Sequence, residues 1–285
     1  IADKFQSLHA RDFILLPLVL AFGFAIDGLY GMGHFLSFGI AAIAATQFFV
    51  PREIVRSSNL SYILGTLLVL IFTWHGVVKF SIWQGLDQFE KKEYPSAKCS
   101  LDYRDAHQLL VSTILSAQCT DKRVNMVTPG LFKKYKTVAA FAYCDVNELS
   151  EDIRSTGYHN QKAKSIQGTS LMIQEEYEGE VPSTMEDLLQ LPGVGRKTAN
   201  CVLGTVFNVP SMVIDTHMVR IMNLLGFTQK KNPVNIEFEI VDIAEEKNWV
   251  ILTHLIIEHG RNVCIARRPQ CSDCCLSDIC PSSLV

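Results

Sequence analysis

Residues 191–200, Leu-Pro-Gly-Val-Gly-Arg-Lys-Thr-Ala-Asn, predict a sharp turn followed at once by a helix. Glycine adopts positive φ without a Cβ clash and lets another backbone approach closely. Gly193 and Gly195 after Pro192 therefore predict a tight hairpin. Beyond the hairpin, apolar residues fall at i, i+3, i+4 and i+7, which is the spacing of one buried helical stripe. These residues are Ala199, Val202, Leu203 and Val206.

Lys197 lies two residues before Ala199, about 200° around a helix of 3.6 residues per turn. We therefore expect its side chain to point away from the buried stripe, in the first turn after the hairpin. Upstream, Ser183-Thr-Met-Glu186 matches a capping box and predicts the start of a preceding helix. A helix-hairpin-helix of this kind directs N–H groups and a positive helix end outward, which suits a phosphate. The alternative is an ordinary helix–helix turn with a solvated lysine.

Residues 1–83 have the composition of a membrane segment. Leu60–Val78 contains 19 residues without Asp, Glu, Lys or Arg, and Gly28–Val50 contains 23, whereas about 20 residues span a bilayer as a helix. Phe13–Ile26 is shorter, and its alternatives are a re-entrant segment or the core of a signal peptide. We predict two or three transmembrane helices. Basic residues after the last span favour a cytoplasmic location for the remainder.

The formal net charge of −3 over 285 residues excludes a broad basic surface, so any site for nucleic acid must be local. Four of the nine cysteines crowd into the C-terminal stretch as Cys264-x6-Cys271-x2-Cys274-x5-Cys280. Such crowding indicates a metal site in a reducing compartment rather than disulfides. Four thiolates at this spacing suit zinc or an iron–sulfur cluster, and spacing alone favours zinc. Cys275 is off the pattern.

Three further runs carry candidate functional residues. Gln118 follows an apolar helical stripe in Ser-Ala-Gln-Cys-Thr-Asp, although a glutamine at a helix end ordinarily meets solvent. Tyr158 lies in a glycine-centred loop that begins a basic helix with Lys162 and Lys164, and the alternative is a surface tyrosine packed on its own loop. Asp215, in Val-Ile-Asp-Thr-His, is a favoured N-cap for the helix that follows it. The buried face predicted for that helix comprises Val219, Met222 and Leu225.

Together, the hairpin, these three runs and the 6-2-5 cysteine spacing resemble the endonuclease III family of helix-hairpin-helix DNA glycosylases and AP lyases. The resemblance covers about residues 95–281, with the motifs in the family's order. It implies an all-α fold of two lobes with DNA between them, here preceded by transmembrane helices. A helical barrel lobe at 104–209 would hold the hairpin. The second lobe would combine 84–103, a connector with a first helix, and 210–285 with a C-terminal iron–sulfur loop.

The resemblance also assigns roles to residues. It implies that Lys197 is the nucleophile, that Asp215 is the catalytic carboxylate, and that Gln118 and Tyr158 enter the DNA as gap filler and wedge. The four cysteines of the 6-2-5 pattern would hold a 4Fe–4S cluster. The further expected DNA contacts are Lys162, Gly193, Gly195, Arg196, His217 and Arg261.

The function that the resemblance implies is a bifunctional glycosylase and AP lyase, which excises oxidised pyrimidines through a lysine Schiff base and β-elimination. Attack requires the neutral amine, which desolvation and a helix N-terminus both favour. The expected partners are double-stranded DNA with damaged bases or abasic sites, and a lipid bilayer through 1–83, with the protein a monomer. The alternative function is a membrane-tethered DNA-binding or redox-sensing module without catalysis. We expect a bacterial protein anchored in the membrane with its catalytic domain in the cytoplasm, or a cytoplasmic one if residues 1–83 are a fusion artefact.

Overall fold

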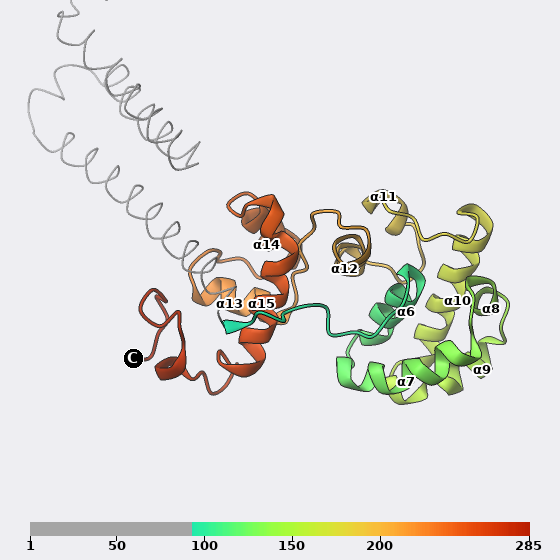
Figure 1. The fold of residues 1–285 in the computed structure, drawn as a ribbon, viewed down its shortest axis with the longest axis horizontal. Coiled ribbons are helices and arrows are strands. Elements are labelled where there is room, and N and C mark those ends of the chain that lie inside the picture. Colours follow the sequence, from blue (N-terminus) through green and yellow to red (C-terminus); the bar gives the residue numbers. More distant parts are fainter. Residues whose placement is uncertain (1–92) are drawn as a thin grey trace, which may run out of the picture. The chain divides into compact units, whose positions relative to one another are not determined.

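A computed structural model describes residues 93–285, and the chain divides into two units between Ile82 and Trp83. The transmembrane helices predicted within 1–83 lie outside the described residues, and the predicted domain boundaries stay predictions. From residue 93 onward, no helix combines the length and the apolar character needed to cross a bilayer. All regular structure from residue 93 to 285 is helical (Figure 1), which confirms the predicted all-α class.

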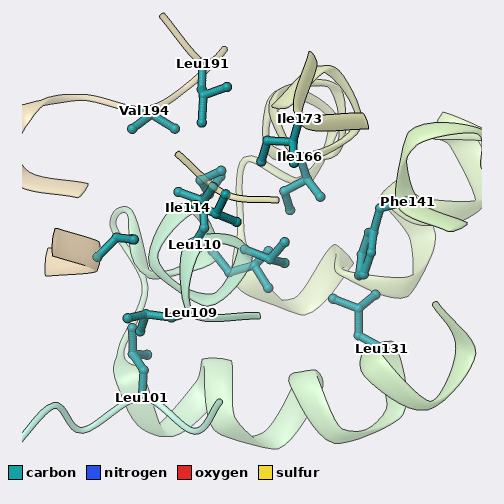
Figure 2. Packing of buried hydrophobic residues seen from close by; sticks show 14 of the residues in the cluster. Leu101, Leu109, Leu110, Ile114, Leu131, Phe141, Ile166, Ile173, Leu191 and Val194 are labelled. Carbon is teal, nitrogen blue, oxygen red and sulfur yellow. The ribbon is translucent and has the colours of Figure 1, made fainter. Parts of the chain in front are cut away.

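The first lobe surrounds one hydrophobic core, whose buried residues run from Leu101 to Leu203. Helix α10 packs against α6, α8 and α9, and α12 packs against α6. Figure 2 shows Leu110 and Ile114 of α6, Ile166 and Ile173 of α10, and Leu191 and Val194 of the hairpin, which all belong to this one core. The elements are α6 (Ala106–Ser116), α7 (Asp121–Lys134), α8 (Val138–Ala142), α9 (Val146–Asp152), η1 (Arg154–Thr156), α10 (His159–Glu176), α11 (Met185–Leu188) and α12 (Arg196–Val206).

The second lobe follows residue 210 and has its own buried residues, which lie outside the first core. Helix α13 packs against α15. The elements are α13 (Thr216–Leu224), α14 (Pro233–Val241), η2 (Glu246–Asn248), α15 (Trp249–Asn262) and η3 (Cys271–Asp273). The predicted face of α13 is correct at Met222 and Leu225, but Val219 is only half-buried, and Met218 and Ile221 complete the stripe.

Polar caps fix where many of these helices begin. Each cap side chain accepts a hydrogen bond from an N–H group of the first turn, which has no partner inside the helix. The caps are Asp105, Thr120, Thr137, Asp145, Thr184, Asp215 and Asn232.

The cap predicted at Ser183 is wrong by one residue. Thr184 accepts from the Asp187 N–H at 3.2 Å, and its hydroxyl donates to the Asp187 carboxylate at 2.6 Å. The box is therefore Thr-x-x-Asp, with Asp187 in the place predicted for Glu186. This register buries Leu188 completely in the core.

Helix α12 joins the two lobes (Figure 1). The amide of Asn200 donates to the carbonyl of Met212 at 2.8 Å, and the hydroxyl of Ser211 donates back to the carbonyl of Asn200 at 2.8 Å. One turn further on, a Cβ at Gly204 would lie 2.8 Å from a methyl group of Val250 in α15. Only glycine permits this close packing. The chain that leads to α13 is thereby held against α12.

Candidate functional site

The hairpin between α11 and α12 is anchored to the core on one side and exposed to solvent on the other. Leu191 and Val194 are buried, and the carbonyl of Pro192 accepts a 2.6 Å hydrogen bond from the hydroxyl of Thr169 in α10. Gly193 has φ +79°, and a Cβ there would lie 2.6 Å from Ser165. These contacts confirm that the turn requires glycine at this position.

Gly195 differs from the expectation of positive φ. It is the N-cap of α12 with φ −99° and ψ 173°, an extended conformation that any residue adopts. A Cβ added there would meet nothing within 4 Å. Gly195 is exposed and no side chain caps the start of α12, so this helix N-terminus is accessible, as a phosphate site there requires.

Lys197 lies in this first turn and is exposed. Ala199, Val202 and Leu203 are buried against the core, as the helical spacing predicts, whereas Val206, the last residue of the predicted stripe, is only half-buried. The prediction that Lys197 points away from the buried stripe is therefore confirmed.

Asp215 is held by both of its carboxylate oxygens. Oδ1 accepts the N–H of Met218 at 2.8 Å, which is the predicted N-cap bond, and Oδ2 accepts from Nδ1 of His217 at 2.8 Å. The side chain is 13% exposed. The His217 ring in turn packs against Gly260 of α15, where a Cβ would lie 2.6 Å from the ring. His217 thus orients the carboxylate, a role that the sequence did not indicate.

Both arginines predicted to bind DNA form ion pairs between the lobes. Arg196 makes two hydrogen bonds to Glu237 of α14, at 2.8 and 2.7 Å, and its guanidinium lies 5.0 Å from the centre of the Phe238 ring. Arg261 of α15 donates to Asp121 of α7 at 2.6 Å. Nothing in the sequence links Arg196 with Glu237, because 41 residues separate them. The proposed DNA contacts of both arginines stay predictions.

Gln118 lies in the loop between α6 and α7, and Tyr158 lies in the loop between η1 and α10. Both are exposed, Tyr158 to 69%. Both also have positive φ, 52° for Gln118 and 50° for Tyr158, a conformation that non-glycine residues rarely adopt. Their roles in DNA stay predictions.

The prediction that Lys162 contacts DNA is wrong. Its side chain is only 5% exposed, and its ammonium donates to the carbonyls of Leu115 and Thr156 at 2.7 and 2.8 Å. Burial lowers the pKa of Lys162. The physical reason is helical phase, because Lys162 lies four residues before the fully buried Ile166. Lys164 is the exposed lysine of this helix.

The four cysteines of the 6-2-5 pattern, Cys264, Cys271, Cys274 and Cys280, line one cavity of about 240 Å³. From residue 93 to 285, no three His, Cys, Asp or Glu side chains gather around a point suited to one metal ion. The cavity wall also includes Arg220 and His259, two cationic or polar groups that the sequence did not single out.

Nitrogen atoms of these two residues approach the sulfurs. Nη1 of Arg220 donates to Sγ of Cys264 at 3.4 Å, and Nε2 of His259 lies 3.7 Å from Sγ of Cys274. A hydrogen bond from Cys275, with a smaller contribution from His259, lowers the pKa of Cys274 to about 4. Thiolates in a partly apolar pocket with nearby N–H donors are the ligands that iron–sulfur clusters use, so these residues fit the group.

Comparisons with known proteins agree with this geometry. Residues 111–246 match HhH-GPD, the HhH-GPD superfamily of base excision DNA repair proteins. Endonuclease III of Synechocystis sp. is 50% identical over 194 residues, which cover 68% of this chain and 89% of the relative.

Two solved structures are similar as well. A non-covalent endonuclease III–DNA complex has 41% identity and a TM-score of 0.67, and the match covers 70% of this chain and 92% of that chain. A trapped endonuclease III–DNA covalent intermediate has 40% identity and a TM-score of 0.68, and the match covers 71% of this chain and 95% of that chain. The chain therefore belongs to the endonuclease III family of HhH-GPD base excision DNA repair proteins.

Proposed function

We propose that this protein is a bifunctional DNA glycosylase and AP lyase that removes oxidised pyrimidines by means of Lys197 and Asp215. Its relatives make it a DNA glycosylase and AP lyase of base excision repair. The observation that carries the residue assignment is the exposed Lys197 in the first turn of α12, on a helix that is hydrogen-bonded to the chain leading to Asp215.

In the proposed reaction, the neutral amine of Lys197 attacks the anomeric carbon of the damaged nucleotide. The bond to the base breaks, and the base leaves with the electron pair and takes up a proton. The sugar ring then opens as its oxygen is protonated, which leaves a Schiff base between lysine and sugar. Removal of a C2′ proton expels the 3′ phosphate by β-elimination, and water hydrolyses the Schiff base.

Asp215 would stabilise the positive charge that develops on the sugar and accept the proton released by the attacking amine. Its orientation would not have to change during the reaction, because Met218 and His217 already hold the two oxygens. The carboxylate cannot turn away from its site without breaking one of these bonds. Asp215 is thus both the cap of α13 and the proposed catalytic carboxylate.

DNA phosphates would bind at the N-terminus of α12. The open space around Gly195 supports this position, since a Cβ there meets nothing. Gln118 and Tyr158 would fill the space of the extruded nucleotide and part the neighbouring base step. The proposed DNA partner is a duplex with a damaged base or an abasic site, bound by one copy of the chain.

We further propose a 4Fe–4S cluster on Cys264, Cys271, Cys274 and Cys280. All four thiols line the same cavity, and Arg220 approaches one of the sulfurs. When bound, the cluster would cross-link four points of the loop by iron–thiolate bonds. Ser282 then ties the last residues to the end of α13, since its hydroxyl donates to the carbonyl of Leu224 at 2.9 Å.

The test is a panel of duplexes incubated with excess full-length protein. One duplex each would carry thymine glycol, uracil, 8-oxoguanine or an abasic site. We expect excision of thymine glycol and strand cleavage without added alkali, because the enzyme supplies the elimination step. Faster excision of uracil or 8-oxoguanine would contradict the substrate assignment. Binding to all duplexes without cleavage would indicate the non-catalytic alternative.

A further inference from the structure

Lys162 occupies the first turn of α10 but is directed into the protein. Two N–H groups of its ammonium donate to backbone carbonyls, that of Leu115 at 2.7 Å and that of Thr156 at 2.8 Å. These carbonyls are 47 residues and 6 residues away in the sequence. One side chain therefore joins two separate segments of the first lobe.

Both carbonyls lie at the ends of helices. Leu115 is next to last in α6, and Thr156 is the last residue of η1. Carbonyl groups in the last turn of a helix have no partner within it, and leaving them buried without one is unfavourable. The Lys162 ammonium supplies the missing donor to both, and a cation at a helix C-terminus is electrostatically favourable.

Each of these carbonyls also lies two or three residues before a residue proposed to enter the DNA. Gln118 follows Leu115 by three residues, and Tyr158 follows Thr156 by two. Both Gln118 and Tyr158 are exposed with φ near 50°. Left-handed conformations of non-glycine residues persist only where the surrounding structure holds them. The lysine thus fixes the point from which each strained loop departs.

We propose that Lys162 is a positioning residue that holds the Gln118 and Tyr158 loops in a fixed mutual register for insertion into the duplex. This inference rests on the proposed function. It also assigns Lys162 to one step of the reaction, the extrusion of the damaged base. Its two partners end the helices that lead into the inserting loops, whereas Lys197 lies in α12 and Asp215 caps α13. Loss of Lys162 should therefore impair extrusion of a stacked base more than the chemistry at a site that already lacks its base.

The experiment uses full-length protein with Lys162→Met, which keeps the length of the side chain and removes its donors. Lys164→Met is the matched control, because it removes an exposed lysine of the same helix. Single-turnover rates would be measured for excision of thymine glycol and for cleavage of a preformed abasic site. Fluorescence of 2-aminopurine beside the lesion would report base extrusion directly.

For Lys162→Met we expect excision and the fluorescence change to fall at least about tenfold, as loss of hydrogen bonds to a charged group allows. Cleavage of the abasic duplex should fall by less than about threefold. Lys164→Met should leave the ratio of the two rates unchanged. An unchanged ratio for Lys162→Met, whether both rates fall together or neither falls, would overturn the proposal.

If Lys162→Met does not fold, Lys162→Leu, which also removes the donors, takes its place, and the same ratio decides. If the wild type excises nothing, the proposed function fails by itself. In that case the 2-aminopurine fluorescence still tests the positioning role of Lys162, because base extrusion does not depend on catalysis. An equal signal in wild type and variant would then overturn the positioning role.

Discussion

Helical phase separates two lysines of α10 that look equivalent in the sequence. Lys162 lies four residues before Ile166 and so shares its face, whereas Lys164 lies two residues before Ile166 on the opposite side. The structure buries Lys162 and Ile166 and exposes Lys164. The helical phase of Lys162 can be derived from the sequence. Because lysine is so seldom buried, however, the basic run favoured a surface position for it instead.

The N-cap role of Asp215 was predictable for a similar local reason, since an Asp before an apolar-periodic segment is a common helix start. Its bond to His217 was not, because the direction of a side chain in the first turn depends on what packs behind it. Here that is Gly260, which lies 43 positions further along the chain and leaves room for the ring.

A residue-scale prediction concerns His107, which is 7% exposed and whose Nε2 is hydrogen-bonded to the hydroxyl of Ser170 at 2.9 Å. Burial lowers the pKa of His107 to about 4. Because this lies below the ordinary value of about 6.5, the unfolded chain takes up a proton first as the pH falls, and stability is lost from about pH 6.5 downward.

The test compares the wild type with His107→Phe, which keeps an aromatic ring beside Phe141. Between pH 7.5 and 5.5, the wild type should lose about 1 kcal/mol more of its unfolding free energy than the variant does. Denaturant unfolding at the two pH values measures this difference. An equal loss in both proteins would show that His107 does not remain neutral in the folded state.

At the scale of elements, the helix-hairpin-helix was predictable because its turn chemistry and its apolar spacing are both local. The role of each glycine was not. Gly193 needs to be glycine on account of positive φ and contact with Ser165 in α10, which is 28 positions earlier in the chain. Gly195 has ordinary backbone angles, and its small size matters only to what approaches from outside.

This contrast predicts opposite effects of two alanine substitutions. Gly193→Ala should destabilise the fold by at least about 1–2 kcal/mol, since it forces a side chain into left-handed backbone and against Ser165. Gly195→Ala should change the melting temperature much less than Gly193→Ala does, because the entropic gain from replacing glycine opposes the loss of a favoured N-cap residue. It should nevertheless weaken binding to abasic-site DNA, because its methyl group would lie between phosphate and backbone N–H groups. Equal DNA affinity of Gly195→Ala and wild type would remove the hairpin from the interface.

At the scale of the whole described molecule, long-range ion pairs hold the lobes together. Glu237 lies 41 residues from Arg196, and Asp121 lies 140 residues from Arg261. No periodicity or spacing predicts such partners. The resemblance correctly implied the all-α fold. It did not indicate that Arg196 and Arg261 would form ion pairs with carboxylates of the other lobe.

A prediction at this scale concerns the proposed cluster ligands, and Cys275, which is adjacent to Cys274 but outside the 6-2-5 pattern, serves as the control. Cys274→Ser should lose iron and the broad visible absorption of a thiolate-bound cluster, while Cys275→Ser, one residue on, should keep both. Elemental analysis of anaerobically purified protein would measure iron and zinc together. Stoichiometric zinc without iron in the wild type would contradict the cofactor assignment.

The central claim is that Lys197 attacks the sugar, and borohydride trapping on an abasic-site duplex tests it most directly. The wild type and the control Lys164→Gln should form a covalent protein–DNA complex. Lys197→Gln should form none and should not cleave the strand. It should still bind the duplex within about threefold of wild type, because phosphate contacts supply most of the affinity. Trapping of Lys197→Gln at the wild-type rate would show that another amine is the nucleophile.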